Sequence, residues 1–129
     1  CGKGLPAEYN KLEAYENKNI IYAGFVDDIN IYFKGADIFI NPVTDGGGIK
    51  TKVVEALGNG LSVISMRSGA TGIPVSITGD KMKITADDDW QEFAGQVKQI
   101  NALSEIPFSF FEHFYWHNIA KKAAGIISN

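Results

Sequence analysis

The chain has 129 residues, a formal net charge of −3 and 45% hydrophobic residues. This length suits a single buried core, so we expect residues 1–129 to form one domain. The fractions of charged residues, 21%, and aromatic residues, 12%, argue against a disordered chain. The acidic balance argues against nucleic-acid binding, which usually needs a basic surface. The one cysteine excludes an internal disulfide and a cysteine-based zinc cage.

The chain starts at Cys1 instead of methionine, which indicates a piece of a longer protein. The first residues, Cys1–Gly4, are typical of the turn that follows a strand, so we expect the sheet to lack its opening strand or strands. No apolar run approaches the ~18 residues of a membrane span, and no signal-peptide pattern opens the chain.

The first segments are expected to form two helices and a strand. Leu5–Glu16 predicts a helix, because a proline lies near its start and apolar side chains recur about three residues apart. Asn19–Phe25 is rich in β-branched and aromatic residues and predicts a buried strand. Asp27 or Asp28 is expected to cap a short helix. The apolar face of that helix comprises Ile29, Tyr32 and Phe33.

A strand, a glycine-rich loop, a helix and a second strand follow in order. They are expected at Asp37–Asn41, at Asp45–Gly48, from about Ile49 to Leu57, and at Leu61–Met66. Pro42 ends the first strand, and Gly58–Gly60 provides the left-handed turn that helices favour at their ends. A loop of small residues then runs through Gly72.

The remainder of the chain is less regular. Short extended segments are expected at Ile73–Ile77 and Lys81–Ala86. The run Asp87–Asp89 is expected to cap an amphipathic helix. The apolar side chains of that helix are Trp90, Phe93, Val97 and Ile100. Further helices are expected from Pro107 through Tyr115 and from about Trp116 to Ile127. This alternation predicts an α/β fold, with a Rossmann-like parallel sheet covered by helices on both faces.

The most informative motif is the glycine loop, Asp45–Gly48. Three successive glycines ahead of a helix leave backbone N–H groups unobstructed, and the helix dipole adds partial positive charge there. That combination binds phosphate. The loop is neither a P-loop nor a Gly-x-Gly-x-x-Gly motif, because the spacings differ.

The charges on the following helix favour an anionic ligand. Lys50 and Lys52 lie in the expected first turn, where the dipole disfavours cations by a few tenths to ~1 kcal/mol each. A bound anion reverses that effect. Thr51, Lys52 and Glu55 share a polar stripe, which places the Glu55 carboxylate where it suits a ribose diol. The alternative is a tight loop beside an ordinary Lys52–Glu55 surface pair worth ~0.2–0.5 kcal/mol.

The stretch GFVDDINIYFKGADIFINPVTDGGGIKTKVVEALGNGLSVIS resembles the carboxy-terminal half of family 4 retaining glycosyltransferases, which have the two-domain GT-B fold. The similarity runs from the initial Gly-Lys-Gly turn to the last helix. In that family this half binds the nucleotide-sugar donor. The resemblance assigns Glu55 to the ribose hydroxyls, the backbone of Gly47, Gly48 and Ile49 to the diphosphate, and the turn Gly24, Phe25 and Val26 to the base. Gly46 and Thr51 complete the expected donor-binding set.

Two departures from the family pattern concern catalysis. Many members carry a glutamate eight residues before the ribose glutamate, where this chain has Gly47. Asp45, two residues away, is expected to substitute in part. The family's basic pair, which neutralises the diphosphate, comes from a segment absent here, so we expect Lys52, with Lys50, to take some of that charge.

The resemblance implies transfer of a sugar from a nucleotide-diphosphate sugar to a glycan, lipid or other acceptor, with retention of configuration and with no metal or further cofactor. The amino-terminal acceptor domain is expected to be missing, so the chain alone is expected to be inactive. We expect a cytoplasmic protein, and peripheral membrane association of the parent enzyme stays open.

Two alternatives come from other functional classes. The first is a non-catalytic nucleotide-sugar-binding or interaction module on the same fold, which Gly47 in place of glutamate favours. The second is an unrelated flavodoxin-like signalling domain. It would need a phosphorylatable aspartate at the end of a strand, whereas Asp37 starts one.

Other candidate residues have simpler interpretations. His113 and His117 are four residues apart, as metal ligands on a helix are, but no third ligand is near and the surrounding aromatics indicate packing. The aromatic cluster from Phe108 to Trp116 is either core or a surface that covers another domain or mediates oligomerisation. Cys1 is expected to be the end of a strand rather than a nucleophile, since no histidine partner can be placed beside it.

Overall fold

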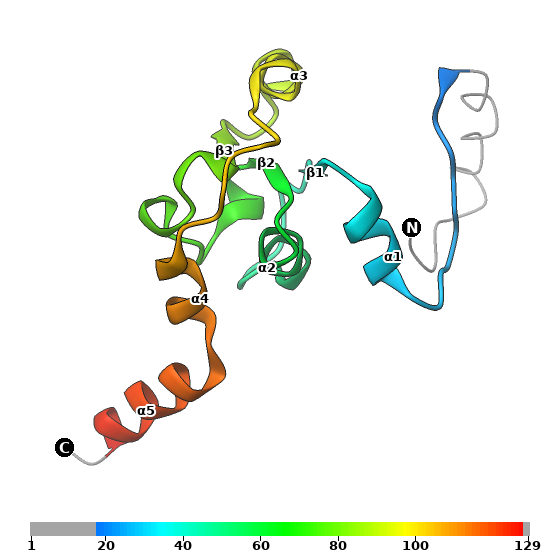
Figure 1. The fold of residues 1–129 in the computed structure, drawn as a ribbon. Helices are drawn as coiled ribbons and strands as arrows, with labels where there is room; N and C mark the ends of the chain where they lie inside the picture. Colours follow the sequence, from blue (N-terminus) through cyan, green and yellow to red (C-terminus); the bar gives the residue numbers. More distant parts are fainter. Residues whose placement is uncertain (1–17, 128–129) are drawn as a thin grey trace. The chain divides into compact units, whose positions relative to one another are not determined.

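The computed structural model describes residues 18–127. The predicted helix Leu5–Glu16 and the predicted turn at Cys1–Gly4 lie outside the described residues. The chain divides between Gly35 and Ala36 into two compact units, and each is described by itself below (Figure 1).

The first unit contains helix α1 (Ile29–Gly35). The carboxylate Oδ1 of Asp28 accepts a hydrogen bond of 2.9 Å from the backbone N–H of Asn30, which confirms the prediction of an aspartate cap. Phe33 is buried at 4% exposure. The other two residues of the predicted apolar face are less buried than Phe33, since Ile29 is half-buried and Tyr32 is exposed.

The predicted buried strand at Asn19–Phe25 is wrong. No strand is assigned to these residues, and the side chains of Ile21 and Phe25 are 87% and 65% exposed. The β-branched and aromatic composition favours extended backbone, but a strand also needs a neighbour that supplies the hydrogen-bond ladder. Within residues 18–127 no strand pairs with this segment.

The second unit is built on a three-stranded parallel sheet. Its strands are β1 (Ile38–Asn41), β2 (Ser62–Met66) and β3 (Met82–Thr85), in the order β1-β2-β3. Every residue of the central strand β2 is buried, as expected for a parallel strand covered on both faces. β1 and β2 lie where strands were predicted, β3 lies within the short extended segment expected at Lys81–Ala86, and the α/β class is confirmed.

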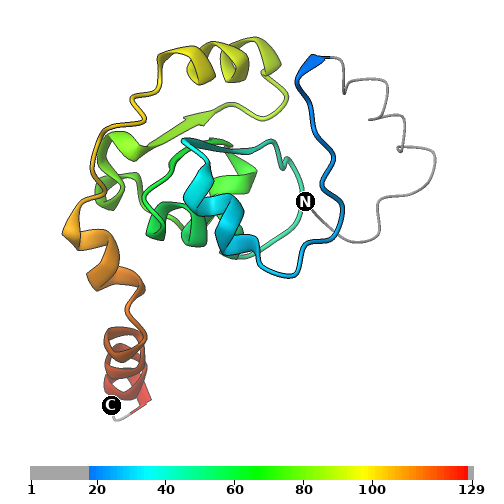
Figure 2. The same ribbon diagram turned by 45° about the vertical axis from the view of Figure 1, so that its right-hand side comes forward.

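Two helices cover this sheet. Helix α2 (Thr51–Gly58) packs on β1 and β2 through three buried side chains, those of Val53, Ala56 and Leu57. Helix α3 (Trp90–Gln99) packs on β2 and β3. In both views, α2 and α3 lie on opposite sides of the strands (Figures 1 and 2). The sheet is therefore the middle layer of a helix–sheet–helix arrangement.

The core between α3 and the sheet matches the expected helical spacing only in part. Phe93 and Ile100 pack with Ile64 and Met66 of β2. Trp90, at 56% exposure, and Val97, at 38%, point outward and depart from the predicted apolar face. The start of α3 follows the prediction, since the Asp89 carboxylate accepts a 2.9 Å hydrogen bond from the N–H of Glu92.

The loop before β3 differs from the prediction at one segment. Ile73–Ile77 was expected to be extended, but Val75–Ile77 forms a 3₁₀ turn. Its local hydrogen bonds run from Ile77 N–H to the Pro74 carbonyl at 3.2 Å and from Thr78 N–H to the Val75 carbonyl at 3.1 Å. With no strand beside it among the described residues, the segment satisfies its backbone within itself.

The last two helices are α4 (Phe108–Phe114) and α5 (Trp116–Ile127), close to their predicted bounds. The side chains of the aromatic cluster Phe108–Trp116 differ in burial. Phe110 is 2% exposed, whereas Phe108 and Trp116 are 74% and 80% exposed.

None of the described helices has the length and apolar character needed to cross a lipid bilayer.

Candidate functional site

The candidate site lies at the carboxyl ends of the three strands. Because the strands are parallel, Asn41, Met66 and Thr85 end at the same edge of the sheet, which we call the carboxyl edge. Ligands of open α/β sheets bind outside this edge. The glycine loop follows β1 there and connects it to α2.

The glycine loop is exposed and folds back on itself. Gly46 and Gly48 have φ values of +90° and +76°, in the left-handed region that favours glycine. The N–H of Gly46 donates to Oδ1 of Asp45 at 2.6 Å. The ammonium of Lys50 donates to the carbonyl oxygens of Gly46 at 2.9 Å and Asp45 at 3.3 Å. Lys50 therefore closes the loop rather than projecting beyond it.

Helix α2 begins at Thr51, two residues after the predicted start, so Ile49 lies ahead of the helix, where its side chain is 50% exposed. Lys50 takes the N-cap position with extended backbone, and no side chain caps the helix. Nor does the first turn contain an acidic residue. This end of α2 thus keeps the partial positive charge that attracts anions.

Lys52 and Glu55 form the i,i+3 pair expected on the exposed face of α2. The Lys52 Nζ atom lies 3.4 Å from Glu55 Oε2, and the two side chains are 60% and 48% exposed. An exposed pair of this kind adds little stability. Both side chains therefore remain accessible to a ligand that arrives at the helix start.

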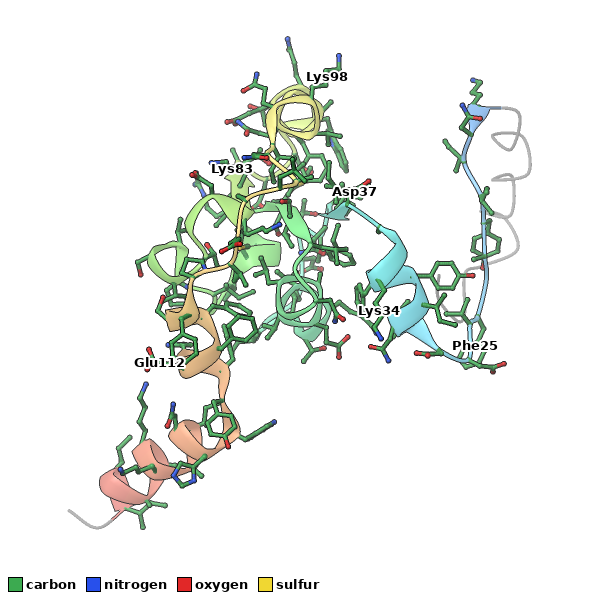
Figure 3. The ribbon with its side chains drawn as sticks, viewed as in Figure 1. Phe25, Lys34, Asp37, Lys83, Lys98 and Glu112 are labelled. Atoms are coloured by element: carbon green, nitrogen blue, oxygen red, sulfur yellow. The ribbon has the colours of Figure 1, made fainter. Side chains whose placement is uncertain are left out.

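The structure brings most of the predicted site residues together in one loop-and-helix segment. That segment comprises Asp45, Gly46, Gly47, Gly48, Ile49, Lys50, Thr51, Lys52 and Glu55. The predicted base-binding turn belongs to the first unit. There Gly24 has a φ of +61°, Val26 is half-buried, and Phe25 projects from the ribbon (Figure 3).

Sequence reasoning missed two hydrogen-bonded links along the carboxyl edge. The amide of Asn41 donates to Ser65 Oγ at 2.9 Å and to the Gly69 carbonyl at 3.1 Å, which ties the end of β1 to the loop after β2. Asp87, expected to help cap α3, instead accepts from the N–H and hydroxyl of Ser68 at 2.9 and 2.8 Å. No sequence signal marks these contacts, because the partners are 19 to 28 residues apart.

The Ser68–Asp87 link also changes an acid–base property. The backbone N–H of Ser68, and then its hydroxyl, hold the pKa of the Asp87 carboxyl below its usual value of 3.8. Asp87 therefore remains a fixed negative charge that binds the loop after β2 to the loop after β3.

The histidine pair has aromatic neighbours. The His113 ring meets Phe114 edge-on at a centroid distance of 4.9 Å, and His117 lies 6.1 Å from Tyr115. Within residues 18–127, no three His, Cys, Asp or Glu side chains gather in a way that would hold a metal ion.

Comparison with known proteins agrees with the motif analysis. Residues 1–102 match the family described as "Glycosyl transferases group 1". A protein of Klebsiella pneumoniae described as "Uncharacterized 44.6 kDa protein in cps region" is 27% identical over 124 residues, covering 92% of this chain and 32% of the relative. The chain thus spans about a third of that relative's length. No solved structure matches the chain. The match over residues 1–102 shows that the chain belongs to the group 1 glycosyl transferases.

Proposed function

We propose that the chain is the donor-binding half of a retaining glycosyltransferase of the GT-B fold, which moves a sugar from a nucleotide-diphosphate sugar to a glycan, lipid or other acceptor. One observation carries this proposal. The glycine loop leaves the carboxyl edge and runs into the uncapped start of α2, with Glu55 exposed one turn further on. Fold class alone would not justify an activity.

The proposed mechanism rests on stabilising the departing diphosphate. The N–H groups of Gly47, Gly48 and Ile49 and the dipole of α2 bind its oxygens. Lys52 leaves Glu55 and supplies positive charge, because Lys50 is engaged with the loop carbonyls. Glu55 then accepts two hydroxyl hydrogen bonds from the ribose. Asp45 faces the donor sugar, and no metal takes part.

The proposal extends to the whole protein. The Klebsiella relative is described as lying in a cps region, which supports polysaccharide biosynthesis as the setting. The parent enzyme would be cytoplasmic, and an amino-terminal domain would bind the acceptor. The exposed aromatic side chains of α4 and α5, such as Phe108 and Trp116, would contact that domain or a second copy of the chain.

Calorimetric titration of the chain with UDP, GDP and ADP, with and without magnesium, tests donor binding. We expect one nucleotide to bind independently of the metal. Glu55→Ala should weaken that binding through the loss of one or two charge-assisted hydrogen bonds, about 1.5–3 kcal/mol each. Glu105→Ala, which removes an exposed carboxylate from the loop after α3, is the matched control. Equal affinity of both variants and the unmodified chain would remove Glu55 from the site.

A non-catalytic nucleotide-sugar-binding module is the second candidate. Gly47 stands where many members of the family have a glutamate, and this absence favours binding without turnover. Sugar transfer by the full-length protein would exclude this candidate, whereas nucleotide binding without turnover would support it.

A further inference from the structure

A second concave site lies away from the glycine loop, where α4, α5 and the 3₁₀ turn Val75–Ile77 meet. This pocket has a volume of about 530 Å³, within the usual range for small-molecule sites. Its lining residues are Ile77, Ser109, Glu112, His113, Asn118, Lys121 and Lys122. Two lysines, a histidine, a serine and an asparagine are thus among its lining side chains, with one carboxylate. We call it the α4–α5 pocket.

The orientation of α5 is unusual for an amphipathic helix. Asn118, Lys121 and Lys122 fall on its polar side and line the pocket, whereas Trp116 and Ile126 on its apolar side are 80% and 78% exposed. A helix that served only to close the core would turn its apolar side inward. In this chain the polar side of α5 faces α4, and its apolar side stays exposed.

The charges of the pocket are not neutralised internally. No hydrogen bond or ion pair engages the side chain of Lys121 or Lys122 within the described residues. Glu112 contributes one carboxylate to the wall, against two ammonium groups. The amide of Asn118 donates to the Glu112 backbone carbonyl at 2.8 Å and fixes the two helices to each other. The pocket thus holds an excess of positive charge between anchored helices.

An aromatic pocket of about 390 Å³ adjoins this one. Glu112 and Asn118 line both pockets, and Phe108, Phe111 and Tyr115 form the rest of the second wall. Lysine ammonium groups are common ligands of phosphate, and aromatic faces bind rings and apolar groups. The two pockets together suit a ligand that has an anionic end and an apolar or ring-shaped end.

We infer that the α4–α5 pocket binds an organic phosphate, with the phosphate against Lys121 and Lys122 and the remaining part against the aromatic wall. This site is separate from the donor site in residues Asp45–Glu55, and the inference does not depend on the proposed function. A free phosphorylated molecule and a lipid phosphate headgroup present the same chemistry, so the experiment includes both.

The test titrates the 129-residue chain with phenyl phosphate, inorganic phosphate and phenol, followed by NMR of the backbone amides. We expect phenyl phosphate to bind most tightly, to shift amides of α4 and α5, and to bind more weakly as salt is added. The double variant Lys121→Ala/Lys122→Ala should lower its affinity by roughly tenfold or more. Tyr115→Ala should reduce phenyl phosphate to the affinity of inorganic phosphate.

The double variant Lys83→Ala/Lys98→Ala is the matched control, because it removes the same charge from β3 and α3, outside both pockets (Figure 3). Flotation with phosphatidylcholine vesicles, with and without phosphatidic acid, forms the lipid arm. The inference is supported if Lys121→Ala/Lys122→Ala loses binding and Lys83→Ala/Lys98→Ala does not. The ligand that shows this loss, phenyl phosphate or the phosphatidic acid vesicle, identifies the source of the phosphate. No binding in either arm, equal loss in both double variants, or shifts confined to the glycine loop would overturn it.

Discussion

Asn41 shows how one side chain organises the carboxyl edge. It is the last residue of β1 and is 7% exposed. Its amide donates hydrogen bonds to Ser65 Oγ and to the Gly69 carbonyl. The loop after β2 therefore lies against the point where the chain leaves β1 toward the glycine loop. Gly69 is the residue that permits this approach. A Cβ there would lie 2.8 Å from Ser65 Oγ and 2.9 Å from the Val43 carbonyl oxygen, and would also overlap the Asn41 amide.

Gly69→Ala is therefore expected to destabilise the chain by about 1–3 kcal/mol, as overpacked cores do. The contacted atoms include backbone, which cannot move aside cheaply. Gly95→Ala is the matched control, because no atom lies within 4 Å of its added Cβ and alanine in a helix gains about 0.5–1 kcal/mol over glycine. Chemical denaturation measures both. A Gly69→Ala variant as stable as the unmodified chain would show that the two loops separate freely.

At the scale of elements, a buried lysine joins three connections of the fold. Lys81 is 3% exposed and precedes β3. Its ammonium donates to the carbonyl of Gly60 at 2.7 Å, after α2, and to that of Ala102 at 2.9 Å, after α3. Two loops that leave helices on opposite faces of the sheet are thus fixed at one point.

Lys81→Met should cost about 2–6 kcal/mol, because it removes the donor of two part-buried hydrogen bonds, whose loss costs ~1–3 kcal/mol each. Lys83→Met provides the comparison. Lys83 pairs with Asp80 at 3.0 Å on the surface, and such pairs are worth about 0–1 kcal/mol. Urea unfolding of the two variants measures the difference, and similar losses in both would rule out a structural role for the Lys81 ammonium.

At the scale of the whole molecule, we expect part of the stability to vary with the protonation of Asp87. Its pKa is lowered in the folded chain by the N–H and then the hydroxyl of Ser68. A carboxyl whose folded pKa lies below its unfolded value stabilises the fold above that unfolded value. The contribution is lost as the pH falls through the folded pKa.

Urea unfolding of the unmodified chain and of Asp87→Asn, from neutral pH to below 3.8, tests this linkage. The stability difference between them should shrink as the solution becomes more acidic. Ser68→Ala removes the hydroxyl bond and keeps the N–H, so NMR titration should find the pKa of Asp87 raised part of the way toward its usual value. If the free energy of unfolding falls by the same amount in the unmodified chain and in Asp87→Asn as the pH is lowered, the proposed dependence on Asp87 is wrong.

Local patterns predicted the elements whose signals lie within one segment. Apolar runs bounded by proline or glycine located β1 and β2, and the Asp89 cap and Pro107 marked the starts of α3 and α4. The prediction of a strand at Asn19–Phe25 was wrong because its signal was also local, whereas a strand needs a partner elsewhere in the chain. Its composition favours extended backbone, yet strand formation depends on a neighbour that composition does not reveal.

The sequence by itself determined the α/β alternation, the glycine loop ahead of α2, and the spacing that places Thr51, Lys52 and Glu55 on one helical stripe, because each depends on residues less than about ten positions apart. Only the structure decided that Lys50 closes the glycine loop, because spacing does not set the direction of a flexible side chain, even toward partners four and five residues away. Only the tertiary structure decided that Asn41 and Asp87 tie the loops of the carboxyl edge together, and that the polar side of α5 lines a pocket with Ile77. The physical reason is that hydrogen bonds and pockets depend on distance in space, and packing brings together residues that the chain keeps far apart.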